Sequence, residues 1–246
     1  MSVEPFPHGD DVTVRPSDNP RGRTGRPPVT SRAQILAAAR ELIDRDGWES
    51  LTIRRLAADL GIGPTTLYHH VRDREDLLIQ LINHHVEQTL RADLPSAPRD
   101  RIVAAVTAIH DSLAAWPWAA EVLTTDGFIL RLGPPALRMV EAIVDAAMDA
   151  GCTAEQAVFL FRDLWYYTAG EILVRAHSTN RPAVDGAFFA GADLTGLPRL
   201  AGIGDRWPVL AAEDSYPGGL RAFVDGLLVR ATAAAAGDQG AAASNR

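Results

Sequence analysis

The stretch that decides the fold is LTIRRLAADLGIGPTTLYHHVRDREDLL, residues 51–78. Thr52 can cap a helix over 53–60, whose apolar side chains recur on one face, and Gly61 ends this helix. A second short helix, over 64–71, begins with a proline in its first turn, where the missing N–H costs nothing. Two short helices joined by a glycine-containing turn predict a helix-turn-helix.

The second helix of this pair has a polar outer face. With Leu67 and Val71 turned inward, the side chains left outside are Thr65, Thr66, Tyr68, His69 and His70. The major groove of DNA admits a helix, and its base edges offer donors, acceptors and a thymine methyl group. A lone histidine pair would more simply be an exposed polar surface, but the flanking pattern here favours contact with DNA.

The helix before the pair is marked just as clearly. Ser31 and Gln34 have the spacing of a capping box, and Gly47 supplies a stop, which predicts a helix over 31–46. Its apolar stripe is Ile35, Leu36, Ala39, Leu42 and Ile43. These three helices, whose apolar faces pack together, form the predicted DNA-binding domain over 29–75, which we call the reader.

The charge of the chain is uneven. All 24 basic residues are arginine; segment 15–75 carries a net charge of +3, and the remainder after residue 75 carries −7. A basic N-terminal third is typical of contact with a polyanion, although mixed charges also simply solvate a surface. Residues 1–28 are rich in Pro, Gly, Asp and Arg and predict a disordered arm. This arm either enters a minor groove or remains a solvated tail.

Composition excludes several classes of protein. A chain of 246 residues with 47% hydrophobic residues can form a substantial core, and the single cysteine, Cys152, excludes an intramolecular disulfide. The acidic N-terminus is not a secretory signal, and no run reaches the ~20 apolar residues of a membrane span. We therefore expect a soluble cytoplasmic protein without a membrane partner.

Residues 31–82 closely resemble the DNA-binding part of tetracycline-repressor-type (TetR family) regulators. The motifs that carry the resemblance are the threonine that opens the second helix, the LA pair, LG in the turn, and TLY followed by two polar or aromatic residues. The resemblance implies an all-α homodimer, in which the three-helix reader precedes a helical domain for ligand binding and dimerisation. That domain would cover 76–236, followed by a disordered tail over 237–246.

The resemblance also implies DNA contacts by motif position. Thr52 and Arg54 would meet the phosphate backbone, where the dipole of the second helix also favours an anion. The base-facing start of the recognition helix would be Gly63, Pro64, Thr65 and Thr66. Tyr68, His69 and His70 would contact phosphates or base edges, and Arg74 would hold a phosphate at the start of the fourth helix.

Apolar periodicity and prolines predict the helices of the body. They are expected over 74–92, 99–116, 134–150, 153–177 and 218–236. The helix over 153–177 is apolar nearly all round, so it must be covered on more than one side. In the family, the last two long helices form the dimer interface; ordinary packing within one chain is the alternative. Segment 178–214 is expected to be irregular, with a short helix near 209–213.

A ligand cavity is expected among the large side chains of the body. Its apolar candidates are Trp116, Trp118, Phe128, Met139, Phe159, Trp165 and Tyr166, with His110, Arg162 and Tyr167 as orienting polar groups. The alternative is that these aromatics are plain core. The tetracycline-binding member of the family has a histidine pair at the end of the fourth helix, where this chain has Thr89 and Leu90, which argues against magnesium-tetracycline.

The sequence thus predicts a repressor that leaves a pseudo-palindromic DNA operator when a small hydrophobic or aromatic effector binds. A repressor or activator without a small ligand is the alternative. A helical enzyme is a remote one, because the chain lacks nucleophile-elbow, zinc-protease and phosphate-loop motifs. No cofactor or metal is expected. His84 and His85 diverge by ~100° around a helix and cannot easily share an ion.

Overall fold

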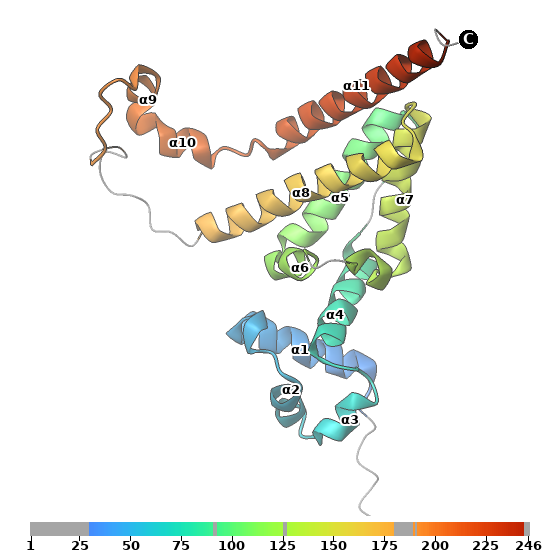
Figure 1. The fold of residues 1–246 in the computed structure, drawn as a ribbon. Coiled ribbons are helices and arrows are strands. Elements are labelled where there is room, and N and C mark those ends of the chain that lie inside the picture. Colours follow the sequence, from blue (N-terminus) through green and yellow to red (C-terminus); the bar gives the residue numbers. More distant parts are fainter. Residues whose placement is uncertain (1–29, 91–92, 125–126, 180–188, 190, 244–246) are drawn as a thin grey trace, which may run out of the picture. The chain divides into compact units, whose positions relative to one another are not determined.

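The computed structural model describes residues 30–90, 93–124, 127–179, 189 and 191–243, and all regular structure within these ranges is helical. The chain divides into two units, Met1–Ser31 and Arg32–Arg246, and the second unit contains every described helix (Figure 1). The arm predicted over 1–28 lies outside the described residues. The all-α prediction is confirmed.

The first helices form the predicted helix-turn-helix. They are α1 Arg32–Asp46, the 3-10 helix η1 Trp48–Ser50, α2 Ile53–Asp59, α3 Pro64–Tyr68 and α4 Arg74–Thr89. All five residues of the stripe predicted for α1 are buried. Helix α3 ends at Tyr68, earlier than the predicted 71, because the chain leaves the helix through bonds from His69 N and His70 N to the carbonyls of Thr66 and Leu67.

Five further helices and one 3-10 helix form most of the body. They are α5 Pro98–Ala114, α6 Pro117–Val122, η2 Phe128–Arg131, α7 Pro134–Asp149, α8 Ala154–Thr179 and α11 Tyr216–Ala243. Pro117 occupies the first turn of α6, where a proline needs no N–H partner, so the predicted end of α5 is also the start of an unpredicted helix. Helix α4 ends at Thr89, short of the predicted residue 92.

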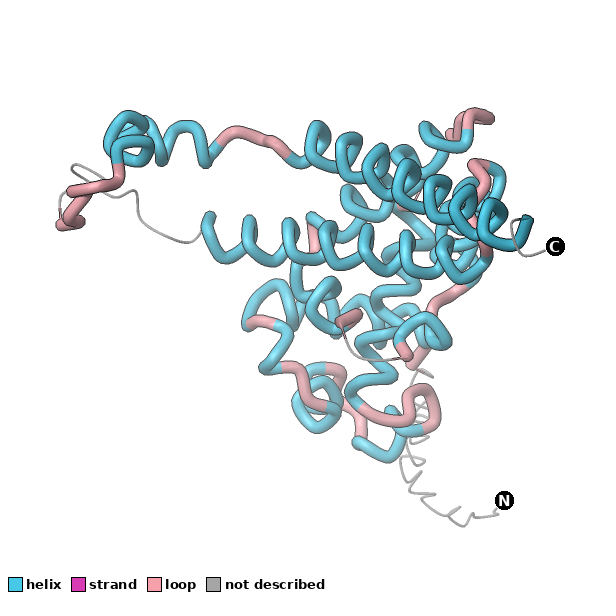
Figure 2. The backbone as a smooth tube through the Cα atoms, turned by 45° about the horizontal axis from the view of Figure 1, so that its top comes forward, coloured by secondary structure: helices cyan, strands magenta, loops and turns pink. Residues whose placement is uncertain are grey.

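Helices α8 and α11 run antiparallel and side by side (Figures 1 and 2). Gln156 Nε2 donates to the carbonyl of Ala231 at 3.1 Å near one end of the pair, and the hydroxyls of Thr168 and Tyr216 lie 2.9 Å apart at the other. Along α8, buried side chains include Leu160, Leu164, Trp165, Ala169 and Ile172. Along the described helices, none combines the length and the apolar character needed to cross a bilayer.

Two predictions for the C-terminal part were wrong. The short helix expected near 209–213 is present as α10 Trp207–Ala212, but the rest of segment 178–214, which was expected to be irregular, also contains α9 Pro198–Ile203 and the 3-10 helix η3 Gly204–Arg206. Helix α11 continues to Ala243, past the predicted end at 236 and into the predicted tail. The added segment, residues 237–243, contains three alanines, the residue with the highest helix propensity, beside two glycines.

Candidate nucleic-acid interface and effector hollow

The two ends of α2 are fixed by a cap and a glycine. Thr52 Oγ1 accepts a bond from Arg55 N at 3.2 Å, as predicted for an N-cap. At the other end of α2, Gly61 has φ +65°, a left-handed conformation that other residues rarely adopt. The amide of Ile62 then bonds back to the carbonyl of Ala57 at 3.0 Å. Helix α3 therefore leaves α2 in a set direction.

Helix α3 is held through two apolar side chains and presents the rest to solvent. Leu67 and Val71 are buried, whereas Tyr68 is 57% exposed. The other predicted contact residues are also solvent-facing: Gly63, Pro64, Thr65, Thr66 and His69 are exposed, and His70 is half-buried. The surface of α3 thus offers two hydroxyls, a phenol and two imidazoles, groups able to bond or stack with base edges.

Most arginines of the reader are engaged within the protein. Between residues 32 and 90, Arg32, Arg40, Arg45, Arg55, Arg72 and Arg74 each donate to a carboxylate, an amide oxygen or a backbone carbonyl. Within this described stretch, Arg54 is the arginine for which no such partner is present. It lies exposed near the start of α2, beside Thr52. A guanidinium left free there can give both of its donor edges to a phosphate.

Arg74 has a different place from the one implied by the resemblance. Its Nε donates to the carbonyl of Leu51 at 2.7 Å, a second guanidinium nitrogen donates to the carbonyl of Trp48 at 2.8 Å, and the group lies 4.9 Å from the centroid of the Trp48 ring. These bonds tie the start of α4 to the chain that leads into α2. The structure therefore gives Arg74 a positioning role in place of the expected phosphate contact.

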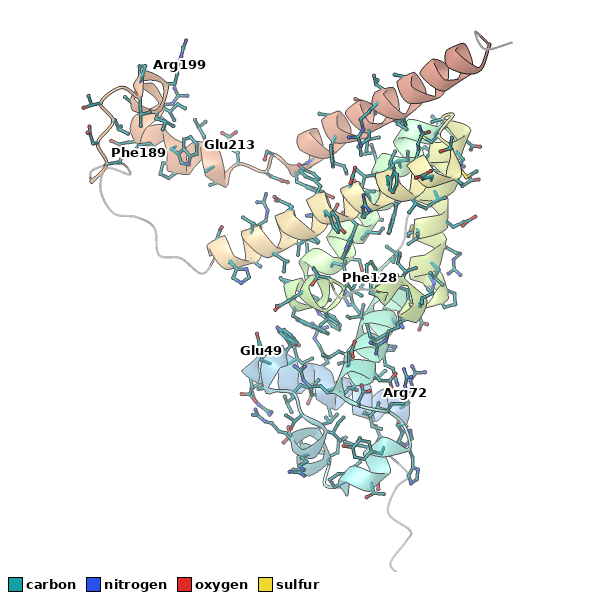
Figure 3. The ribbon with its side chains drawn as sticks, viewed as in Figure 1. Glu49, Arg72, Phe128, Phe189, Arg199 and Glu213 are labelled. Carbon is teal, nitrogen blue, oxygen red and sulfur yellow. The ribbon has the colours of Figure 1, made fainter. Side chains whose placement is uncertain are left out.

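Sequence reasoning missed Gln80, which connects three helices. Its Nε2 donates to the carbonyl of His70 at 3.2 Å and to Asp76 Oδ2 at 2.9 Å, while its Oε1 accepts from Arg32 Nε at 3.0 Å. Burial acts to raise the pKa of Asp76, but hydrogen bonds from Arg72 and Gln80 outweigh it and leave the pKa below its usual value. Arg72, labelled in Figure 3, lies in the loop between α3 and α4. A sequence pattern could not reveal this link, because hydrogen-bond partners of Gln80 lie far from it in the sequence.

Two hollows lie against α8 in the body. The inner hollow has a volume of about 50 Å³ and an apolar lining that includes Ile82, Val86, Leu90, Ser112, Leu113, Ala136, Phe128, Phe161 and Trp165. The outer hollow, of about 370 Å³, is lined by residues that include Thr124, Arg162, Tyr166, Leu173, Phe128, Phe161 and Trp165. Phe128, Phe161 and Trp165 line both hollows, and the rings of Phe128 and Trp165 lie 5.3 Å apart. Figure 3 labels Phe128 in the region beneath α8.

The predicted ligand residues are therefore divided. Phe128, Arg162, Trp165 and Tyr166 line one or both hollows, as expected. The other predicted residues line neither. Met139 packs in the core, Phe159 lies exposed with Arg162 over its ring at 5.0 Å, and His110 stacks on Tyr216 at 4.1 Å. Tyr167 stacks on Tyr216 as well, at 5.5 Å.

Trp116 and Trp118 stack on each other at 5.2 Å, away from both hollows. The inner face of Trp116 meets His85, whose ring lies 4.0 Å away at 16°. Burial lowers the pKa of His85, and the nearby guanidinium of Arg40 lowers it further, against an opposing hydrogen bond to the Ser112 carbonyl. His85 is thus a core histidine. Periodicity could place these rings inside the protein, but it could not say which cavity they face.

A 3-10 helix links the wall of the hollows to α4. Asn83 Nδ2 donates to the carbonyl of Arg131 at 3.0 Å, and Gly133 N donates to Asn83 Oδ1 at 2.7 Å. Arg131 also forms an ion pair with Glu75 in the first turn of α4. Phe128 begins the same 3-10 helix, so displacement of its ring would act on α4 through these bonds.

The comparisons with known proteins agree with this geometry. A family model described as "Bacterial regulatory proteins, tetR family" matches residues 35–81. An HTH-type transcriptional regulator of Saccharopolyspora erythraea is 34% identical over 142 residues, 57% of this chain and 57% of that protein. Tetracycline repressor protein class E of Escherichia coli is 30% identical over 148 residues, 56% of this chain and 65% of that protein. The chain thus spans less than two thirds of the length of either relative.

The likeness to a solved structure extends beyond the helix-turn-helix into the body. The TetR family protein ActR of Streptomyces coelicolor, in complex with (S)-DNPA, superposes with a TM-score of 0.65 at 22% identity, covering 81% of this chain and 97% of that one. At this identity, the likeness shows the fold alone. The helix-turn-helix over residues 35–81 thus belongs to the tetR family of bacterial regulatory proteins, and the likeness of fold to ActR extends into the body.

Proposed function

We propose that this protein is a sequence-specific DNA-binding transcriptional regulator, and that α3 reads the major groove. The observation that carries the proposal is the outer face of α3: Leu67 anchors the helix, while Thr65, Thr66, Tyr68 and His69 face solvent. A helix of this kind meets base edges with its N-terminal residues while the preceding helix crosses the backbone. Arg54, near the start of α2, supplies the phosphate contact.

Footprinting on the DNA upstream of the protein's own gene tests this proposal. Specific binding should exceed binding to random DNA by about 10³-fold or more at physiological salt and should weaken as salt rises. Tyr68→Ala should remove most of the preference. Equal affinity for both DNAs over the whole salt range would contradict the proposal.

We infer that the regulator acts as a homodimer formed through α8 and α11. Several apolar side chains on these helices remain exposed in a single chain: Val158, Phe159, Tyr166, Val174 and Val229. Tyr166 is 63% exposed on a long helix whose other faces are buried. A second copy would cover this surface and hold two α3 helices about 34 Å apart, the spacing of successive major-groove faces.

The dimer can be tested by sedimentation. Tyr166→Glu and Val229→Glu should each shift the protein to a monomer, because an unpaired carboxylate in an apolar interface is costly. Leu130→Glu is the matched control, since Leu130 is 91% exposed and lies on η2, outside the proposed interface. A dimer that tolerates both interface charges would exclude this surface.

We further propose that a small hydrophobic or aromatic effector binds against Phe128 and Trp165 and releases the protein from its operator. The outer hollow, at about 370 Å³, has the volume of a ligand pocket, whereas the inner one, at about 50 Å³, does not. An effector that moves Phe128 inward would pull on η2 and, through Asn83, on α4. To switch occupancy from nearly full to nearly empty, it must favour the released state by about 10⁴-fold.

Screening hydrophobic compounds for release of the bound DNA tests the effector. Phe128→Ala should change the concentration of compound needed for release while leaving DNA affinity without compound unchanged. Leu137→Ala is the control, because Leu137 is exposed on α7 and lies outside both hollows and outside the proposed dimer interface. A regulator without a small ligand is the second candidate, and the small inner hollow favours it. Failure of every compound to alter binding would support that candidate.

A further inference from the structure

Trp116 makes a direct contact between the reader and the body. The guanidinium carbon of Arg40, on α1, lies 3.9 Å from the centroid of the Trp116 ring. The ring of His85, on α4, stacks on the same indole at 4.0 Å. Trp116 itself is 5% exposed and caps the start of α6. Three elements, α1, α4 and α6, therefore meet at one side chain.

This cluster also touches the wall of the inner hollow. His85 Nε2 lies 2.8 Å from the carbonyl of Ser112, and a carbonyl can only accept, so Nε2 carries the proton and donates. Ser112 lines the inner hollow, and its hydroxyl lies 2.8 Å from that of Thr89 at the end of α4. A change at the hollow thus reaches His85 through a single hydrogen bond.

We propose that Arg40, Trp116 and His85 form a joint that sets the position of the reader relative to the body, and that adding a proton to His85 opens this joint and weakens operator binding. The inference rests on the proposed DNA-binding function. Arg40, Trp116 and His85 are positioning residues in this proposal, since none of them lies on the outer face of α3.

The charges around His85 explain why a proton opens the joint. Nε2 is already protonated, so the added proton goes to Nδ1 and creates an imidazolium that is nearly enclosed. From α1 it faces Arg40, which remains a cation although Asp44 holds its Nε at 2.6 Å. From α4 it neighbours His84, from α5 it meets the Ser112 carbonyl, and at the start of α6 it meets the indole of Trp116.

An aromatic ring attracts a cation, but the ring of Trp116 is already in contact with the guanidinium of Arg40. Cation–π attraction is worth about 0.5–2 kcal/mol, and Arg40 takes it up at 3.9 Å. A second cation against the same indole meets repulsion from Arg40 and the cost of leaving water. Release of Arg40 from Trp116 relieves the repulsion and frees α1 from the start of α6. Release of His85 relieves both the repulsion and the cost of leaving water, and it frees α4 from the same indole.

The test is the pH dependence of DNA affinity, measured with the full chain and its own upstream DNA at constant salt. For each variant, the dissociation constant at pH 5.5 is divided by that at pH 7.5. Variants are compared with one another, so that pH effects common to all of them cancel. The wild-type ratio should exceed that of His85→Gln by about fivefold or more, the usual lower range of allosteric coupling.

His84→Gln is the matched control, because His84 is the neighbouring histidine and is exposed. Its ratio should equal that of the wild type. Arg40→Gln should lower the ratio towards that of His85→Gln, and Arg40→Lys, which keeps the cation, should restore it. Equal ratios in wild type and His85→Gln, or an effect of His84→Gln as large as that of His85→Gln, would overturn the joint. Affinity at pH 7.5 reports separately on DNA binding itself, so the two failures are distinguishable.

Discussion

The hydroxyl of Thr168 and the phenol of Tyr216 lie 2.9 Å apart, both buried, where α8 meets the start of α11. Each is the polar partner of the other in an otherwise apolar core. Removing one partner leaves the other buried and unsatisfied, so Tyr216→Phe or Thr168→Val alone should cost about 1–3 kcal/mol of unfolding free energy. The double variant should be nearly as stable as the wild type. Chemical denaturation of the four proteins checks this, and additive single effects would contradict the pairing.

Arg54 and Arg74 should respond oppositely to the same substitution. Arg54→Met should weaken DNA binding and reduce the slope of log affinity against log salt by about 1, with unchanged stability, because it removes one phosphate contact. Arg74→Met should lower the free energy of unfolding by about 1–3 kcal/mol, since two backbone carbonyls lose a charged donor. Denaturation and salt titration of both variants measure the contrast. A reduced salt slope in Arg74→Met, with stability unchanged, would restore its expected phosphate contact.

Gln80→Ala should weaken operator binding although Gln80 lies outside the reading face. The substitution removes the bond to the His70 carbonyl and the bond from Arg32, so the end of α3 loses its tie to α4 and α1. Hydrogen exchange of α3 amides should speed up and the dissociation constant should rise. Gln88→Ala, on the exposed part of the same helix, is the control. Unchanged exchange in α3 would show that Gln80 does not hold it.

His85 should make the protein less stable in acid. Burial lowers its pKa in the folded state below the value of about 6.5 expected in the unfolded chain, so the unfolded state binds more protons between the two values. Stability from this group is fully present above pH 6.5 and decreases as pH falls through that window. The melting temperature of His85→Gln should therefore fall less than that of the wild type between pH 7.5 and 5.5. Parallel curves would contradict the assigned shift.

The sequence predicted those parts of the fold that follow from local pattern. The stripe of α1, the Thr52 cap and the buried Leu67 depend on spacing within one helix, so periodicity and capping rules sufficed. Helix α10 lies where a short helix was expected, near 209–213. Helix α9 escaped notice because it is short and has no buried residue, which leaves no buried stripe to detect.

Contacts between distant parts of the chain could not be predicted in the same way. Arg74 reaches carbonyls at Leu51 and Trp48, and Gln80 joins residues from α1 and α3. Of the predicted cavity residues, Trp165 and Arg162 on α8 line a hollow, whereas Trp116 does not. That indole turns towards α1 and α4, a direction that depends on how helices pack and not on the order of residues.

The shortness of α3 has a consequence for how target preference can change. Two buried side chains, Leu67 and Val71, anchor this segment. The side chains between and before them contribute almost nothing to the free energy of folding. Replacing Thr66 or His69 should therefore alter which base pairs are favoured at little cost in folding. The DNA sequence preference can therefore be changed one residue at a time, while the fold stays the same.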